Sequence, residues 1–256
     1  LKWNVSANIS FNRNKLLRLA DDSTKEAVIN NFNILRVGEP LGLFKTYVYD
    51  GIMQTGETVI PGQPVNNPRP GTQKVKDVNG DGKITADDRI ITGNANPKFI
   101  YGFSTSLKYK AFDFSLFFSG SYGGKIFNLA RWSLENPVGG RNVLAGLADR
   151  WSTSNPGGQY QTSIGSSGGR LPLSDRFLED GSFLRCKNLS VGYTFKPKGI
   201  QNMRAYISAN NLFTITKYTG FDPEVGSFGN SNTQFGVDNI VYPMQRSFLF
   251  GLQITL

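Results

Sequence analysis

The sequence predicts an all-β fold: an antiparallel transmembrane β-barrel with long external loops, of which this chain is a fragment. Several segments alternate strictly between apolar and polar residues, the period of a strand with two different faces. These segments are about 10–12 residues long, as a tilted membrane-spanning strand requires, whereas strands of soluble domains are nearer five or six. Very long connections also alternate with short ones, which is typical of outer-membrane barrels.

The alternating segments follow one another like consecutive strands. They are residues 1–11, 101–109, 112–118, 189–195, the weaker 203–213, and 247–256. On one face of the last segment lie Phe248, Phe250, Leu252, Ile254 and Leu256. Because the chain begins in the middle of a strand pattern, we expect it to be a piece of a longer protein.

The connections set the expected orientation. Tight links at 110–111 and 196–202 contrast with 123–182 and 214–245, which are long, polar and rich in Gly, Ser and Asn. Compact soluble domains rarely carry two structureless loops of that length. Counting strands back from a periplasmic C-terminus places these loops, and the stretch about 50–97, outside the cell.

Residues 13–40 do not fit this regular pattern. They are expected to form a long periplasmic connection or to contain a further strand pair that the pattern does not locate.

Composition excludes several classes of function. The chain has a net charge of +9, but its Lys and Arg residues are scattered singly, which argues against nucleic-acid binding. It has no His and one cysteine, Cys186, so the usual general base, most zinc sites and an internal disulfide framework are not available. No apolar run approaches the roughly 18 residues of a transmembrane helix. We expect no catalytic residue and no enzymatic activity.

Residues 77–88 carry the most specific chemistry in the chain, because they have the spacing of a calcium-binding loop. The expected ligands are the side chains of Asp77, Asn79, Asp81 and Asp88 and the backbone carbonyl of Lys83. Gly82 stands where the loop turns sharply.

Two features separate this loop from an EF-hand. The template has a bidentate Glu at its last position, so the shorter Asp88 is expected to soften the affinity toward that of extracellular modules. The flanking residues do not resemble paired helices. The alternative is a turn rich in Asp and Asn, held by hydrogen bonds from side chains to the backbone, with no metal.

Other candidate residues have simpler explanations. Asp222 and Glu224 resemble the paired carboxylates of glycoside hydrolysis, but a turn with solvated charges is the favoured interpretation. Five aromatic residues are able to stack on sugar rings, although packing anchors or an interfacial belt explain any one of them better. These residues are Trp132, Trp151, Tyr160, Tyr218 and Tyr242.

The chain resembles the C-terminal part of SusC/RagA-type TonB-dependent outer-membrane transporters of Bacteroidetes. The stretches that carry the resemblance are 11–15 (FNRNK), 37–42 (VGEPLG), 49–52 (YDGI), 77–82 (DVNGDG), 88–89 (DR), 93–99 (GNANPKF), 183–193 (FLRCKNLSVGY), 209–213 (ANNLF) and the terminal strand. They occur in order from end to end, so the resemblance covers essentially the whole chain.

This resemblance implies a barrel of about 22 strands with a plugged lumen, embedded in outer-membrane lipid. This chain would be a C-terminal fragment that supplies about eight to ten of those strands. It also implies an importer of oligosaccharides or peptides that works with a SusD-like surface lipoprotein and with a TonB complex, through parts outside this chain. The calcium-type loop 77–88 then lies within an external loop. The alternative function is a secreted or cell-surface β-sandwich that binds glycans and has a structural calcium.

Overall fold

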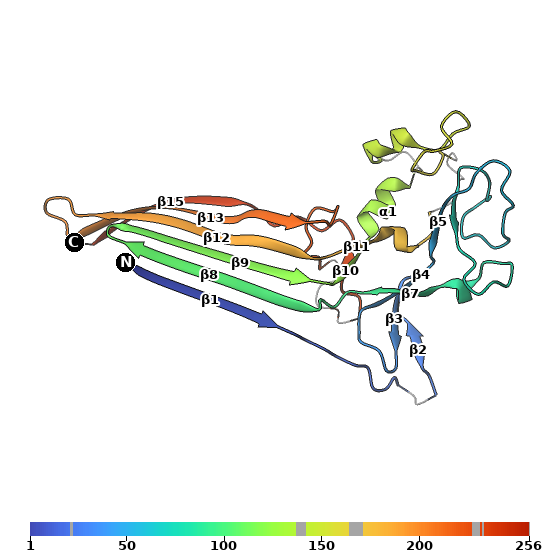
Figure 1. The fold of residues 1–256 in the computed structure, drawn as a ribbon, viewed down its shortest axis with the longest axis horizontal. Helices are drawn as coiled ribbons and strands as arrows, with labels where there is room; N and C mark the ends of the chain where they lie inside the picture. Colours follow the sequence, from blue (N-terminus) through green and yellow to red (C-terminus); the bar gives the residue numbers. More distant parts are fainter. Residues whose placement is uncertain (21–22, 137–141, 164–170, 227–230, 232, 256) are drawn as a thin grey trace.

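The computed structural model describes residues 1–20, 23–136, 142–163, 171–226, 231 and 233–255. It shows a long, twisted antiparallel sheet with a cluster of smaller sheets and short helices at one end (Figure 1). We call this second part, built from residues 11–98, 123–182 and 217–246, the end cluster. No helix within the described residues is long and apolar enough to cross a membrane.

The long sheet contains six strands within the described residues, all paired antiparallel. In spatial order they are β1 (Lys2–Ser10), β8 (Phe99–Tyr109), β9 (Phe112–Tyr122), β12 (Phe183–Phe195), β13 (Asn202–Thr216) and β15 (Ser247–Thr255). The antiparallel β fold is thereby confirmed. The described residues form no closed barrel, and the sheet has fewer strands than the eight to ten expected. Leu256 lies outside the described residues.

The pairing of β1 with β8 corrects the expected orientation of the first third of the chain. Their register runs from Lys2 opposite Lys108 to Ser10 opposite Ile100. Because the two strands are antiparallel neighbours, residues 11–98 leave and re-enter the sheet at the same end. They form one connection, so residues 13–40 are not a separate link at the opposite end of the sheet. They contain instead the other expected feature, a short antiparallel strand pair, Glu26–Val28 with Asn33–Arg36.

The strand register places apolar residues on one face of the long sheet in every strand. One row crosses all six strands and consists of Trp3, Leu107, Phe114, Val191, Ile207 and Phe250. The neighbouring row, on the opposite face, consists of Asn4, Ser106, Ser115, Ser190, Ser208 and Leu249. A slip of one residue in any strand would exchange its two faces, so the two-sided pattern specifies this register.

A β-bulge keeps the pattern in phase along β12. The register of this strand shifts against both neighbours between Cys186 and Asn188. The extra residue lets Cys186 and Leu189, three positions apart, remain on the apolar face. The same shift leaves Arg185 on the polar face, opposite Ser119.

An ion pair on the polar face ties strands that are not direct neighbours. Arg204 of β13 donates from Nε to Oδ1 of Asp113 in β9 over 2.9 Å, crossing above β12. Gly192 lies beneath this pair, and a Cβ there would come within 2.6 Å of the Arg204 guanidinium. A side chain at position 192 would therefore displace the pair.

The end cluster contains folded structure where the sequence suggested structureless loops. Its strands are β2 (Glu26–Val28), β3 (Asn33–Arg36), β4 (Leu43–Thr46), β5 (Tyr49–Ile52), β6 (Gln73–Val75), β7 (Ile90–Asn94), β10 (Lys125–Asn128), β11 (Leu178–Asp180) and β14 (Val237–Asp238). Its helices are α1 (Leu129–Glu135) and the 3-10 turns η1 (Ala86–Asp88), η2 (Ala145–Asp149) and η3 (Asp175–Phe177). The prediction failed because these strands are too short to show a clear period.

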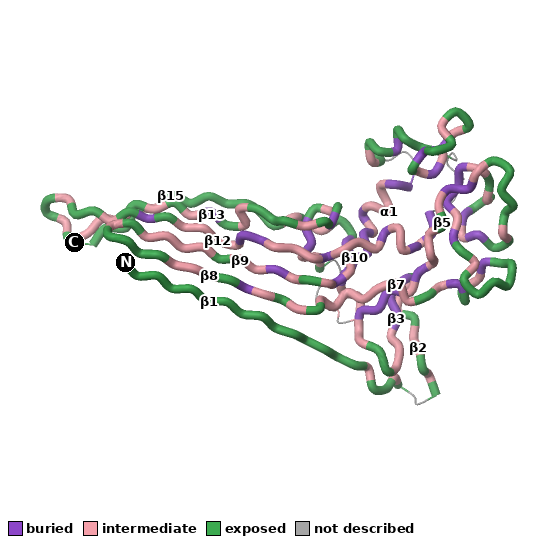
Figure 2. Tube along the Cα trace, in the orientation of Figure 1, coloured by how far each residue is buried: buried purple, intermediate pink, exposed green. Residues whose placement is uncertain are grey.

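The main hydrophobic core lies in the end cluster, whereas the long sheet remains largely exposed or half-buried (Figure 2). The buried core residues are Phe32, Phe44, Phe127, Leu171, Phe177 and Val237. They come from all three connections, and the rings of Phe32 and Phe127 stack with their centroids 4.3 Å apart. Three segments far apart in sequence therefore fold as one unit.

Replacing Phe127 by Ala is expected to destabilise the end cluster by about 3–5 kcal/mol, because it leaves a cavity in a fully buried site. Denaturant unfolding, followed through Trp132 and Trp151 fluorescence, would measure the loss. The matched control is Phe221→Ala, since that ring is 66% exposed in the same cluster. Equal effects of the two substitutions would contradict the assigned core.

Candidate functional site

The predicted calcium loop forms a compact turn held by its own side chains. The two carboxylate oxygens of Asp77 accept hydrogen bonds from the backbone N–H groups of Gly80 and Gly82, over 2.7 and 2.8 Å. Asn79 Oδ1 accepts from the N–H of Asp81. Gly80 and Gly82 have φ angles of +76° and +81°, a conformation that L side chains rarely adopt. The loop shape therefore depends on both glycines.

Asp88 closes the loop from a buried position at the end of η1. Its carboxylate accepts from the N–H of Thr85 over 2.7 Å and from the N–H of Val78 over 2.9 Å. These hydrogen bonds, foremost that from Thr85, hold the pKa of the Asp88 carboxyl below its ordinary value. The ionised Asp88 carboxylate thus connects the beginning of the loop, at Val78, with its later part, at Thr85.

The loop retains the chemistry of a cation site. An ionised carboxylate offers about four lone-pair sites, so the Asp77 and Asp81 oxygens keep acceptor capacity beyond their bonds to backbone N–H groups. In the described part of the chain, no three His, Cys, Asp or Glu side chains form a group that could hold a metal ion. Calcium binding at this loop stays a prediction.

Asp222 and Glu224 hold the connection 217–246 onto the long sheet. Asp222 is buried and pairs with the buried guanidinium of Arg185, while Glu224 pairs with Lys187 over 2.7 Å. Asp222 also accepts the backbone N–H of Met244 over 3.0 Å. Burial raises the pKa of Asp222, but its hydrogen bonds outweigh this and lower it. The prediction of solvated charges is wrong for Asp222, because Arg185 neutralises its buried carboxylate, whereas Glu224 is half-exposed.

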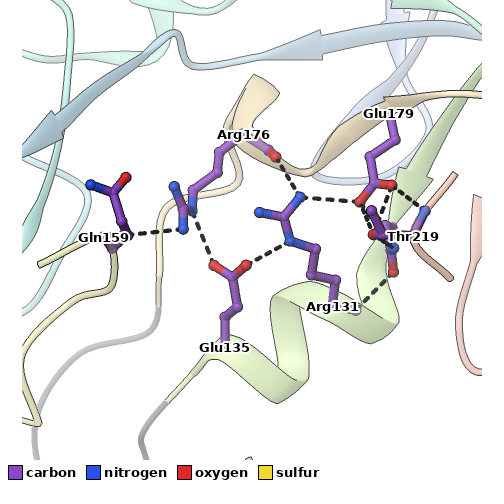
Figure 3. A network of polar contacts seen from close by, with 7 residues as sticks. Arg131, Glu135, Gln159, Arg176, Glu179 and Thr219 are labelled. Atoms are coloured by element: carbon purple, nitrogen blue, oxygen red, sulfur yellow. Dashed lines mark hydrogen bonds and ion pairs between the residues drawn. The ribbon is translucent and has the colours of Figure 1, made fainter. Parts of the chain in front are cut away.

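A second charged network connects α1 to η3 and β11 (Figure 3). Arg131 donates from Nε to Glu135 over 2.6 Å and from Nη1 to Glu179 over 3.1 Å. Arg176 donates from Nε to the second oxygen of Glu135 over 3.0 Å. Burial lowers the pKa of Arg131, but the two carboxylates outweigh it and raise the pKa. The guanidinium is therefore a fixed cation.

Comparisons with known proteins identify the family. No family model matches the chain. It is 35% identical over 270 residues to TonB-dependent receptor P3 of Formosa agariphila, covering 98% of this chain and 26% of that receptor. It is 31% identical over 271 residues to TonB-dependent receptor SusC of Bacteroides thetaiotaomicron, covering 98% of this chain and 24% of that one. The chain is homologous to part of the SusC/RagA-type TonB-dependent receptors.

The solved structure of the RagAB peptide transporter supports this homology. It superimposes on 98% of the receptor segment with a TM-score of 0.77 and 25% sequence identity, and this covers 27% of the transporter chain. The segment thus spans about a quarter of the length of its curated relatives. These relatives are receptors and not enzymes, in agreement with the sequence.

Among the aromatic candidates of the receptor segment, Trp151 and Tyr218 are buried, Trp132 and Tyr160 are half-buried, and Tyr242 is exposed. Trp151 donates its indole N–H to Gln54 over 2.9 Å, and Trp132 donates to the carbonyl of Leu171 over the same distance. The buried Tyr218 hydroxyl donates to Asp238. Burial and this carboxylate raise the pKa of Tyr218. Tyr242 remains 80% exposed, so packing explains the first three but not Tyr242.

Sequence patterns did not reveal the two charged networks of the receptor segment. The spacing of Arg131 and Glu135, four residues apart, was a usable signal for a helical ion pair. Arg176 and Glu179 join them through tertiary contacts that no local pattern indicates. Arg185 likewise finds Asp222 across the fold.

Asp88→Asn is expected to destabilise the receptor at neutral pH, because the amide removes a carboxylate that accepts three backbone N–H bonds. A pKa lower in the folded state means that the carboxylate stabilises the fold above its ordinary pKa, and that this contribution is lost as the pH falls through the folded-state value. Thermal midpoints of wild type and variant should therefore converge on acidification. Asp87→Asn, at an exposed neighbour, is the control; a midpoint difference independent of pH would refute the role of Asp88.

Proposed function

We propose that the chain is the C-terminal barrel portion of an outer-membrane transporter of a Bacteroidetes-type bacterium that imports peptides or oligosaccharides. A SusD-like surface lipoprotein acts as its lid, and a TonB complex drives it through parts outside this chain. The apolar row that crosses all six strands of the long sheet carries this proposal. Homology to the SusC/RagA-type receptors supports it.

The exposure of the apolar face favours contact with lipid. In the row across the sheet, Trp3 is 67% and Phe250 is 74% exposed, and Val191 and Ile207 between them are also exposed. Soluble proteins rarely leave a contiguous apolar patch of more than a few hundred Å² uncovered. A barrel wall has this arrangement, with apolar residues toward lipid and polar residues toward a wet lumen.

The asymmetry between the two ends of the sheet supports the orientation. Residues 110–111 and 196–201 make short turns at one end, whereas all three long connections fold together at the other (Figure 1). Short periplasmic turns and long external loops are typical of outer-membrane barrels. The end cluster accordingly lies outside the cell in this proposal, where a lid lipoprotein would meet it.

The alternative, a secreted glycan-binding β-sandwich, requires a second sheet packed face to face on the apolar face. The smaller sheets of the described residues lie instead at the end of the long sheet (Figure 1). The homologous RagAB structures are named as a peptide transporter and a peptide importer, which supports a peptide ligand for this chain as well.

Calcium at residues 77–88 is the remaining part of the proposal. The loop supports a neighbouring segment, since the N–H of Ile84 donates to the carbonyl of Pro61 over 2.7 Å and Ile84 itself is buried. A cation held by Asp77, Asn79, Asp81, Asp88 and the Lys83 carbonyl would stabilise the loop, and with it the contact to Pro61, by neutralising the carboxylates. It would act as a structural clip.

Val191→Arg is expected to destabilise the full-length receptor in lipid by up to about 2–4 kcal/mol, because a charge on the lipid face must be desolvated. Ser190→Arg is the matched control, since Ser190 is the adjacent residue of the same strand and faces the polar side. Urea unfolding from vesicles, with heat-modifiable gel migration as the sign of a folded barrel, would measure both. A larger loss for Ser190→Arg, or a receptor that is soluble without detergent, would overturn the barrel.

Calcium is expected to raise the thermal midpoint of the full-length receptor relative to chelator, and Asp81→Ala should abolish the difference. Asp50→Ala provides a control carboxylate outside the loop. The same midpoint with calcium and with chelator in the wild-type protein would eliminate the metal site and leave the hydrogen-bonded turn.

A further inference from the structure

A cavity of about 440 Å³ opens between α1 and residues 219–221 in the end cluster. Its size falls within the range of small-ligand pockets, about 300–1,000 Å³. One wall is apolar, and the polar part of the lining consists of Asn128, Arg131 and Thr219. The apolar wall consists of Ala130, Leu134, Leu144, Tyr160 and Phe221.

Arg131 is held rigidly at the wall of this cavity. Glu135, whose side chain is almost fully buried, and Glu179 fix its Nε and Nη1 atoms (Figure 3). Among the hydrogen bonds of the described residues, none uses its Nη2 atom. A guanidinium has five N–H donors in a planar fork, and the two on Nη2 have no hydrogen-bond partner among the described residues. A donor whose position is fixed in advance loses little entropy on binding.

The charge of the network selects the kind of acceptor. Arg131 and Arg176 are balanced by Glu135 and Glu179, so the cluster has no formal net charge. A neutral carbonyl oxygen therefore suits the free donors, and no additional anion is needed.

The apolar wall selects the rest of the ligand. Leu134 and Leu144 offer no hydrogen-bond partner, so sugar hydroxyls placed against them would lose their hydration without compensation. An apolar side chain has no hydrogen bonds to water that it would lose when it packs against these leucines. The Phe221 ring stands mostly exposed beside the cavity, and Tyr160 is fixed against the Arg176 guanidinium, 5.6 Å from its ring centroid. Aromatic rings of this kind are frequent anchors in protein recognition.

We propose that this cavity is a peptide subsite, in which an apolar side chain enters between Leu134, Leu144 and Phe221 while Arg131 Nη2 donates to a backbone carbonyl oxygen of the peptide. The inference rests on the proposed importer function and narrows it to peptides with an apolar residue.

The test uses the full-length receptor with its lipoprotein partner in detergent, and calorimetry with acetylated, amidated Gly/Ser heptapeptides that carry a central Leu or a central Asp. The central-Leu peptide should bind more tightly than the central-Asp peptide. Phe221→Ala should weaken binding of the central-Leu peptide about tenfold. Tyr242→Ala, an exposed aromatic of the same connection that does not line the cavity, should leave it unchanged.

A second variant tests the cavity without touching the ion network. Leu144→Asn keeps the side-chain size but adds an amide, so it should reduce the preference for Leu over Asp in the peptide. Wild-type affinity in the Phe221→Ala protein would overturn the subsite. Binding of maltoheptaose by the wild type with no binding of either peptide would also overturn it, but would leave the importer function intact. A receptor that is soluble without detergent would instead refute the importer function itself.

Discussion

The strand register of the long sheet is the constraint on which the rest of the structure depends. Because side chains alternate with a period of two, each strand must pair in one register for Trp3, Val191 and Phe250 to share a face. The bulge after Cys186 preserves this phase, and the polar face gains the ion pair between Asp113 and Arg204. The antiparallel order of the six strands also places the three long connections together at one end of the sheet.

The end cluster is stabilised differently, by a buried aromatic core and by paired charges. Phe32 and Phe127 join two connections by stacking, and the ion pair of Arg185 with Asp222 fastens the third to the sheet. A buried carboxylate without its partner would leave an unpaired charge that costs several kcal/mol. These ion pairs and stacked rings give the end cluster a fixed shape at the end of the sheet, and the proposed peptide subsite depends on the fixed charges around Arg131.

The sequence supported most of the long sheet but little of the end cluster. Segments such as 112–118 and 247–255 keep one face apolar at every second residue, although Phe117 and Leu249 interrupt the opposite, polar face. The weaker pattern at 203–213 coincides with Asn211, whose φ of +50° lies where the register of β13 against β12 shifts. The network of Arg131 and Glu179 forms through tertiary contacts. The sequence pattern could therefore indicate only the ion pair of Arg131 with Glu135 within α1. Loop 77–88 was recognisable as a turn, since its hydrogen bonds are local.

Lipid contact along β12 tests the account most directly. Single cysteines introduced at positions 189 to 195 of the full-length receptor, with the buried native Cys186 left in place, would carry spin labels in vesicles. The account predicts that accessibility to oxygen dissolved in lipid peaks at positions 189, 191, 193 and 195, and that accessibility to a water-soluble nickel complex peaks between them. Equal access of the nickel complex to both sets of positions would contradict a sheet with one face in lipid.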